Sequence, residues 1–80
     1  MFYSVSTENE VGGTGNISTS LVTVSESLIP VVDAAKDLLC DSILFQLFEN
    51  GKPVSWCRMD PNEEITYETV VASLMQNHKG

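Results

Sequence analysis

The dipeptide Asn50-Gly51 separates two apolar runs, residues 43–49 (ILFQLFE) and 52–58 (KPVSWCR). A two-residue type I′ turn needs positive φ at both central positions, which asparagine and glycine tolerate best. Asn-Gly between apolar runs is therefore the strongest short-range signal for a β-hairpin. The sequence predicts that these two runs pair as antiparallel strands.

An uninterrupted register from this turn places Phe45 opposite Trp56 and makes one face strongly apolar. This predicted core face, expected to pack on a helix, carries Ile43, Phe45, Leu47, Val54 and Trp56. The opposite face carries Leu44, Gln46, Phe48, Pro53, Ser55 and Cys57, and is too apolar for a fully solvated face. Cover from the N-terminal strands or the second helix is the favoured explanation, and a second copy or a target is the alternative.

The N-terminal part of the sequence, up to residue 24, predicts a second hairpin. Residues 2–7 (FYSVST) and 17–24 (ISTSLVTV) are rich in β-branched and aromatic types, which favour strands. Residues 8–16 (ENEVGGTGN), which lie between these two runs, contain three glycines. This segment is expected to be a flexible loop.

Between residues 25 and 41, apolar side chains recur at spacings of three and four, which predicts a helix. Its apolar stripe comprises Leu28, Val31, Val32, Ala35, Leu38 and Leu39. Ser27 is the expected N-cap, and Pro30 then falls in the first turn, where its missing N–H removes no intrahelical bond.

A second helix is predicted near the C-terminus, with two alternatives for its start. Residues 60–64 (DPNEE) supply a capping acid, a proline suited to the first helical position and a capping-box glutamate. Alternatively, residues 65–67 stay extended and Thr66 caps the helix. In either case the apolar stripe comprises Tyr67, Val71, Leu74, Met75 and His78. The tail at residues 77–80 is expected to fray.

The element order ββαββα predicts one small α+β domain over residues 1–80. A mostly antiparallel sheet of three or four strands, with two helices on one face, is the expected architecture. The N-terminal hairpin can join either edge of the central hairpin.

The formal net charge is −7, from 11 acidic and 4 basic residues. Phosphate backbones and anionic membranes are bound by clustered Lys and Arg, so direct binding to nucleic acid or membrane is not expected. A basic protein partner is favoured instead. The N-terminus lacks the pattern of a signal peptide, which predicts a cytoplasmic location where Cys40 and Cys57 remain thiols.

No motif for catalysis or cofactor binding is present. The glycine-rich residues 12–16 lack the Lys-Ser/Thr pair of a phosphate-binding loop, and two cysteines with one histidine lack zinc-site spacing. The sequence therefore predicts a protein that is not an enzyme and needs no cofactor or metal.

Four acidic residues, spaced by 7, 4 and 4, fall on one side of the first predicted helix: Glu26, Asp33, Asp37 and Asp41. We term this set the acidic ridge. It is either a solvated helix face or a docking face for a basic partner. The predicted partner-binding residues are this ridge, together with Glu8 and Glu10 of the glycine-rich loop and Phe48 of the hairpin.

A short acidic α+β chain without catalytic motifs is similar in style to many small phage and mobile-element proteins. We therefore predict a small non-enzymatic binding protein, an inhibitor that occludes a basic surface of a larger host protein. One alternative is a structural or assembly subunit that forms a homodimer or larger oligomer through Phe48 and a free strand edge. A DNA mimic is a second alternative, although it needs carboxylates spread densely over a wide face.

Overall fold

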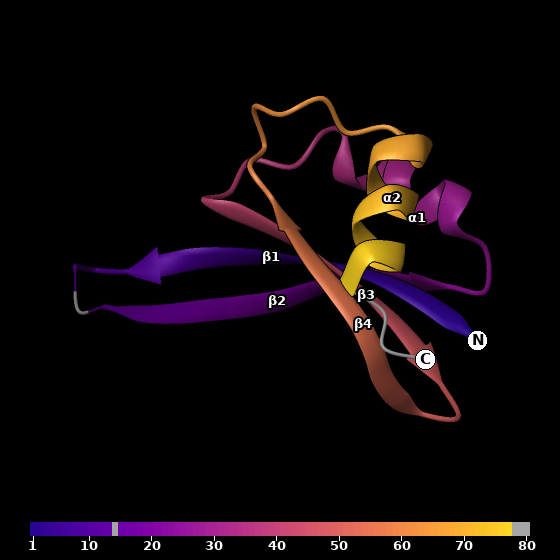
Figure 1. The fold of residues 1–80 in the computed structure, drawn as a ribbon. Helices are drawn as coiled ribbons and strands as arrows, with labels where there is room; N and C mark the ends of the chain where they lie inside the picture. The colour runs from indigo at the N-terminus through magenta and orange to yellow at the C-terminus, as the bar shows by residue number, and fades with distance from the viewer. Residues whose placement is uncertain (14, 78–80) are drawn as a thin grey trace.

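A computed structural model describes residues 1–13 and 15–77 as a four-stranded antiparallel sheet with two helices (Figure 1). The elements are β1 (Phe2–Val11), β2 (Asn16–Ser25), α1 (Leu28–Ala35), β3 (Ser42–Glu49), β4 (Lys52–Met59) and α2 (Tyr67–Asn77). The strand order β2-β1-β3-β4 shows that the N-terminal hairpin joins the central one through β1. The α+β fold and the ββαββα order are as predicted.

Both helices pack on the same face of the sheet (Figure 1). The core between the layers is built from Val5, Leu28, Val31, Val32, Ala35, Ile43, Phe45, Cys57, Met59, Ile65, Val70 and Leu74. No described helix covers the other face, which we term the open face. The explanation that the rest of the chain covers the apolar second face of the hairpin holds only in part. β1 lies beside β3 and not over it, so Phe48 is only half-buried, whereas Ser55 and Cys57 of that predicted face lie against the helices.

The Asn50-Gly51 turn forms as predicted, with φ angles of 53° and 78°. The register beyond it is interrupted by a β-bulge: Phe48 pairs with Pro53, but Leu47 pairs with Ser55, so Val54 is left between them. Proline has no N–H to donate to the ladder, and bulges are among the few positions in a sheet that accept it.

The bulge reverses which β4 side chains point toward the helices. Ser55, Cys57 and Met59 are buried, and the Ser55 hydroxyl donates to the carbonyl of Leu74 in α2. Trp56, predicted in the core, is 49% exposed and shares the open face. Val54, also predicted in the core, is half-buried, whereas the β3 members of that set are buried as predicted.

The N-terminal hairpin has longer strands than expected. The turn of the predicted 8–16 loop is confined to residues 12–15, because β1 continues to Val11 and β2 starts at Asn16. The turn glycines at 12, 13 and 15 have positive φ, and Thr14 lies outside the described residues. The hairpin projects beyond β3, since the last β1–β3 pair joins Glu8 to Ser42 (Figure 1).

Helix α1 starts as predicted but ends early. Ser27 is the N-cap by backbone conformation, although its side chain makes no capping bond. The helix ends at Ala35, so Leu38 is half-buried and Leu39, predicted in the apolar stripe, is 98% exposed. The segment 36–41 must carry the chain back to the sheet to begin β3, and this requirement overrides the helical pattern of its leucines.

Helix α2 follows the second of the two alternatives. Thr66 caps it in a reciprocal exchange with Thr69: each backbone N–H donates to the other side chain's Oγ1, at 2.9 Å and 3.2 Å. Asp60 organises only a turn: its Oδ1 accepts the N–H of Asn62 at 2.8 Å, and its backbone carbonyl accepts the N–H of Glu63 at 2.9 Å.

The buried stripe of α2 is formed by Val70 and Leu74. Of the predicted stripe, Leu74 is buried and Val71 is half-buried against the core. Tyr67 and Met75, predicted to be buried, are 48% and 63% exposed. The predicted role of His78 lies outside the described residues. The predicted fraying at 77–80 also falls on residues outside the described range, apart from Asn77, whose backbone ends α2.

Candidate functional site

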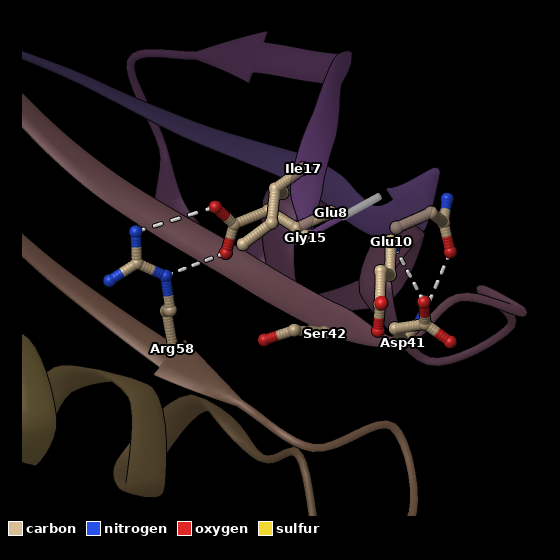
Figure 2. A pocket seen from close by; sticks show the side chains of 8 residues that line it. Glu8, Glu10, Gly15, Ile17, Asp41, Ser42 and Arg58 are labelled. Atoms are coloured by element: carbon tan, nitrogen blue, oxygen red, sulfur yellow. Dashed lines mark hydrogen bonds and ion pairs between the residues drawn. The ribbon is translucent and has the colours of Figure 1, made fainter. Parts of the chain in front are cut away.

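A pocket of about 470 Å³ opens at one end of the open face, beside the projecting hairpin (Figure 2). Its lining comes from both N-terminal strands and the turn between them, the 36–41 segment, β3 and β4: Glu8, Asn9, Glu10, Gly15, Ile17, Asp41, Ser42 and Arg58. Segments far apart in the sequence therefore meet at this one place.

An ion pair between Glu8 and Arg58 forms one wall of the pocket (Figure 2). Arg58 donates from Nε to Glu8 Oε1 at 2.7 Å and from Nη2 to Oε2 at 3.4 Å. This hydrogen bonding, with the charge of Glu8, raises the pKa of Arg58 above its ordinary value. The pair reaches across β3 from β1 to β4, over Leu44, which is only 8% exposed.

The same arginine is held on its other side by an aromatic ring. Its Cζ lies 4.8 Å from the centroid of the Trp56 ring, a cation–π geometry. The side chain of Arg58 is half exposed, whereas that of Glu8 is only 7% exposed. The carboxylate is therefore fixed within the sheet surface, and the guanidinium links the pocket to the aromatic part of the open face.

Asp41 ties the 36–41 segment to the projecting hairpin. Its Oδ2 accepts the backbone N–H of Glu10 at 2.8 Å, and its own N–H donates to Asn9 Oδ1 at 3.0 Å. Glu10 and Asp41 are exposed, and no cation is paired with either in residues 1–13 and 15–77. The pocket's three carboxylates and one guanidinium leave it a formal charge of −2.

Away from the pocket, the open face carries several exposed apolar side chains next to small or polar ones, among them Gln46 and Thr19. Register places Val24 beside Ser4 and Leu21 beside Ser6, and these serines are 2% and 4% exposed. The large apolar side chains exposed by 44% or more on this face are Phe2, Ile17, Leu21, Val24 and Trp56. The open face thus combines an apolar surface with an anionic pocket at one end.

The structure divides the predicted partner-binding residues into two groups. Glu8, Glu10 and Asp41 line the pocket, and Phe48, paired with Phe2, is half-buried on the same open face. The remaining acids, Glu26, Asp33 and Asp37, lie around α1, where Asp33 pairs with Lys36 at 3.4 Å.

The acidic ridge is therefore not one helical face, because α1 ends before Asp37 and Asp41. Sequence reasoning also missed Arg58, Trp56 and Ile17 as parts of the site. The bulge at Val54 puts Trp56 and Arg58 on the open face, and the only local signal for it was Pro53.

Both cysteines are free thiols with different surroundings. Burial raises the pKa of Cys57 from 9.0 to about 11, while burial and the nearby charge of Asp41 raise the pKa of the more accessible Cys40. At pH 8 a thiol with a pKa near 11 is ionised in only about one molecule in a thousand, and the thiolate is the reactive form.

We therefore expect Ellman's reagent to react with Cys57 about 100-fold more slowly in the folded protein at pH 8 than in urea, and Cys40 to be the faster of the two thiols in the folded protein. A Cys40→Ala variant should retain only the slow thiol, which becomes fast in urea. Equal reaction rates for the two thiols in the folded state would contradict the placement of Cys57.

The burial of Cys57 also predicts that the free energy of unfolding falls as the pH rises from about 9 toward 11, because the unfolded thiol ionises first.

Comparisons with protein-family models, curated proteins and solved structures found no match to this chain. Within the described residues, no group of His, Cys, Asp and Glu is arranged to hold a metal ion. Neither described helix has the length and apolar character to cross a bilayer. The candidate site is therefore defined by its own geometry and chemistry.

Proposed function

We propose that this chain is a small non-enzymatic binding protein that docks a basic surface of a partner protein on its open face. The observation that carries the proposal is the placement of both helices on one side of the sheet. This arrangement leaves apolar side chains exposed on the other side, next to a pocket with an excess of carboxylates.

The apolar part of the open face supplies the contact area. Contiguous exposed apolar surface, especially with polar groups at its rim, is typical of interaction sites. Trp56 is the natural anchor, because the guanidinium of Arg58 lies against its ring and restricts its motion before binding. An aromatic side chain held in place loses less conformational entropy on association.

The anionic pocket supplies charge selectivity. Glu8 and Arg58 neutralise each other, so Glu10 and Asp41 remain as hydrogen-bond acceptors for a lysine or arginine side chain of the partner. The net charge of −7 accelerates the approach of a basic protein and disfavours acidic ones. A protein of this kind acts by occlusion, which is the mechanism expected of a phage or mobile-element inhibitor of a host protein.

The pocket acids can be tested with a fluorescent strand-forming peptide of alternating lysine and leucine as a basic, apolar probe. We expect the double variant Glu10→Gln/Asp41→Asn to weaken peptide binding about three- to thirtyfold, measured by fluorescence anisotropy at several salt concentrations. Both replacements are nearly isosteric, and an asparagine at position 41 keeps an oxygen that can accept the Glu10 N–H.

The matched control is Glu63→Gln/Glu68→Gln, which removes the same charge from the turn before α2 and from α2 itself. This control should change the affinity less than about twofold, because its carboxylates do not line the pocket. If the two double variants weaken binding equally, the peptide senses only net charge and the proposed site is wrong.

A further inference from the structure

Strand β2 forms one edge of the sheet and is ten residues long. Nearly all its residues are exposed, and no described strand lies along its outer side. An edge strand presents N–H and C=O groups to any other strand, and natural proteins usually protect such edges with charge, proline or bulges.

The two edges of this sheet differ in protection. The other edge, β4, carries Lys52, Pro53 and Arg58, all of which discourage a further strand. In contrast, Asn16–Ser25 contains no charged residue and no proline. Its one irregularity is a bulge at Val22, where the register with β1 shifts. The segment 17–21 before this bulge is regular and uncharged.

We infer that a second copy of this chain pairs with β2 in antiparallel fashion, and this inference does not depend on the proposed function. The segment Ile17–Leu21 reads ISTSL, which has nearly the same pattern in both directions. Pairing centred on Thr19 places each Ile17 beside the other copy's Leu21, and each Ser18 beside the other copy's Ser20. A strand with this symmetry satisfies the requirement of a two-fold interface, in which the same surface serves both partners.

The side chains suit this register. Ile17 and Leu21 lie on the open face and are 63% and 64% exposed, so two apolar cross-strand pairs would remove all four from water. The two-fold axis is perpendicular to the sheet, so both open faces lie on the same side. The result is a continuous eight-stranded sheet in which the other copy's Leu21 adds to the pocket wall formed by Ile17.

The absence of charged residues on β2 allows a second acidic copy to approach at this edge. Two chains of net charge −7 repel each other through most of their surfaces, but β2 offers an uncharged approach. In the proposed register the two Glu26 residues lie on opposite sides of the axis. The two Glu8 residues are about 14 Å apart, three strand spacings, and each is already paired with Arg58. A basic strand would find no carboxylate on β2 itself.

The test uses sedimentation velocity from micromolar to about millimolar protein, a range that covers interfaces of modest size. The wild-type chain should shift from 8.8 kDa toward twice that mass as the concentration rises. Ser18→Lys/Ser20→Lys places lysines opposite each other and should stay monomeric, as should Ser18→Glu/Ser20→Glu. An equimolar mixture of the two variants should restore a dimer, because each lysine then faces a glutamate.

The control Ala72→Lys/Gln76→Lys, on the exposed side of α2, adds the same charge away from β2 and should leave the dimer intact. Circular dichroism confirms that each variant is folded. The inference is overturned if the wild-type chain is monomeric at about 1 mM, which would leave the edge to the strand of another protein. It is also overturned if the lysine variant dimerises as the wild-type chain does.

Discussion

Replacing Phe45 with alanine is expected to lower the free energy of unfolding by about 3–5 kcal/mol, the usual cost of truncating a buried phenylalanine. Phe45 is fully buried at the centre of the sheet, on the face packed against the helices. A chain of 80 residues has a total stability of only about 4–12 kcal/mol. The variant should therefore unfold at much lower urea concentration, as followed by circular dichroism, and a substantial fraction should be unfolded without urea.

The companion variant is Trp56→Ala, and it distinguishes the bulged register from the uninterrupted one. In the bulged register Trp56 is about half exposed on the open face, so its loss should cost about 1 kcal/mol. In the uninterrupted register Trp56 would lie opposite Phe45 in the core, and the two variants would cost similar amounts. Comparable losses in the two urea titrations would show that the bulge is wrong.

The parts of the fold that the sequence predicted correctly depend on local chemistry. The turn needed two residues that accept positive φ, and Asn50-Gly51 supplies them. The buried face of α1, Leu28, Val31, Val32 and Ala35, follows from helical spacing within a single segment. In both cases neighbouring residues contain all the information, so no knowledge of the rest of the chain was required.

The errors arise where a distant segment decides the outcome. The leucines at 38 and 39 continue the helical spacing of α1, but the chain leaves the helix at Ala35 because β3 begins at Ser42. The segment between them is fixed by the contacts of Asp41 with β1, more than 30 residues earlier. A helical pattern in one segment carries no information about such contacts.

Some residues of the candidate site were predicted from the sequence, but the secondary structure on which their prediction rested is not the one in the fold. The spacing of acidic residues predicts Asp41 in a helical ridge, yet it lies in the pocket through its bonds to the projecting hairpin. The glycine-rich sequence predicts a flexible loop around Glu8, yet Glu8 is a strand residue that pairs with Arg58, 50 residues later. That pair forms only because β3 separates β1 from β4, and this strand order was left open by the sequence.

Removing the two partners of the ion pair across β3 one at a time should lower the free energy of unfolding by clearly unequal amounts. Arg58→Met keeps much of the apolar stem but leaves the Glu8 carboxylate, only 7% exposed, without its cation. We expect this variant to lose about 2–3 kcal/mol, since an unpaired charge at a buried position carries a large desolvation penalty. Glu8→Gln leaves a guanidinium that is half exposed and can be hydrated, so it should lose only about 1 kcal/mol.

The double variant Glu8→Gln/Arg58→Met completes the cycle and identifies the cause of the loss. If the penalty of Arg58→Met comes from the stranded carboxylate, replacing that carboxylate with a neutral amide should recover most of it. The double variant should then be more stable than Arg58→Met alone in urea titrations at neutral pH. If the arginine instead acts mainly by packing over Leu44 and Trp56, the two losses add and nothing is recovered. An additive result would therefore assign the stability of this surface to side-chain packing and leave the ion pair a role only in shaping the pocket.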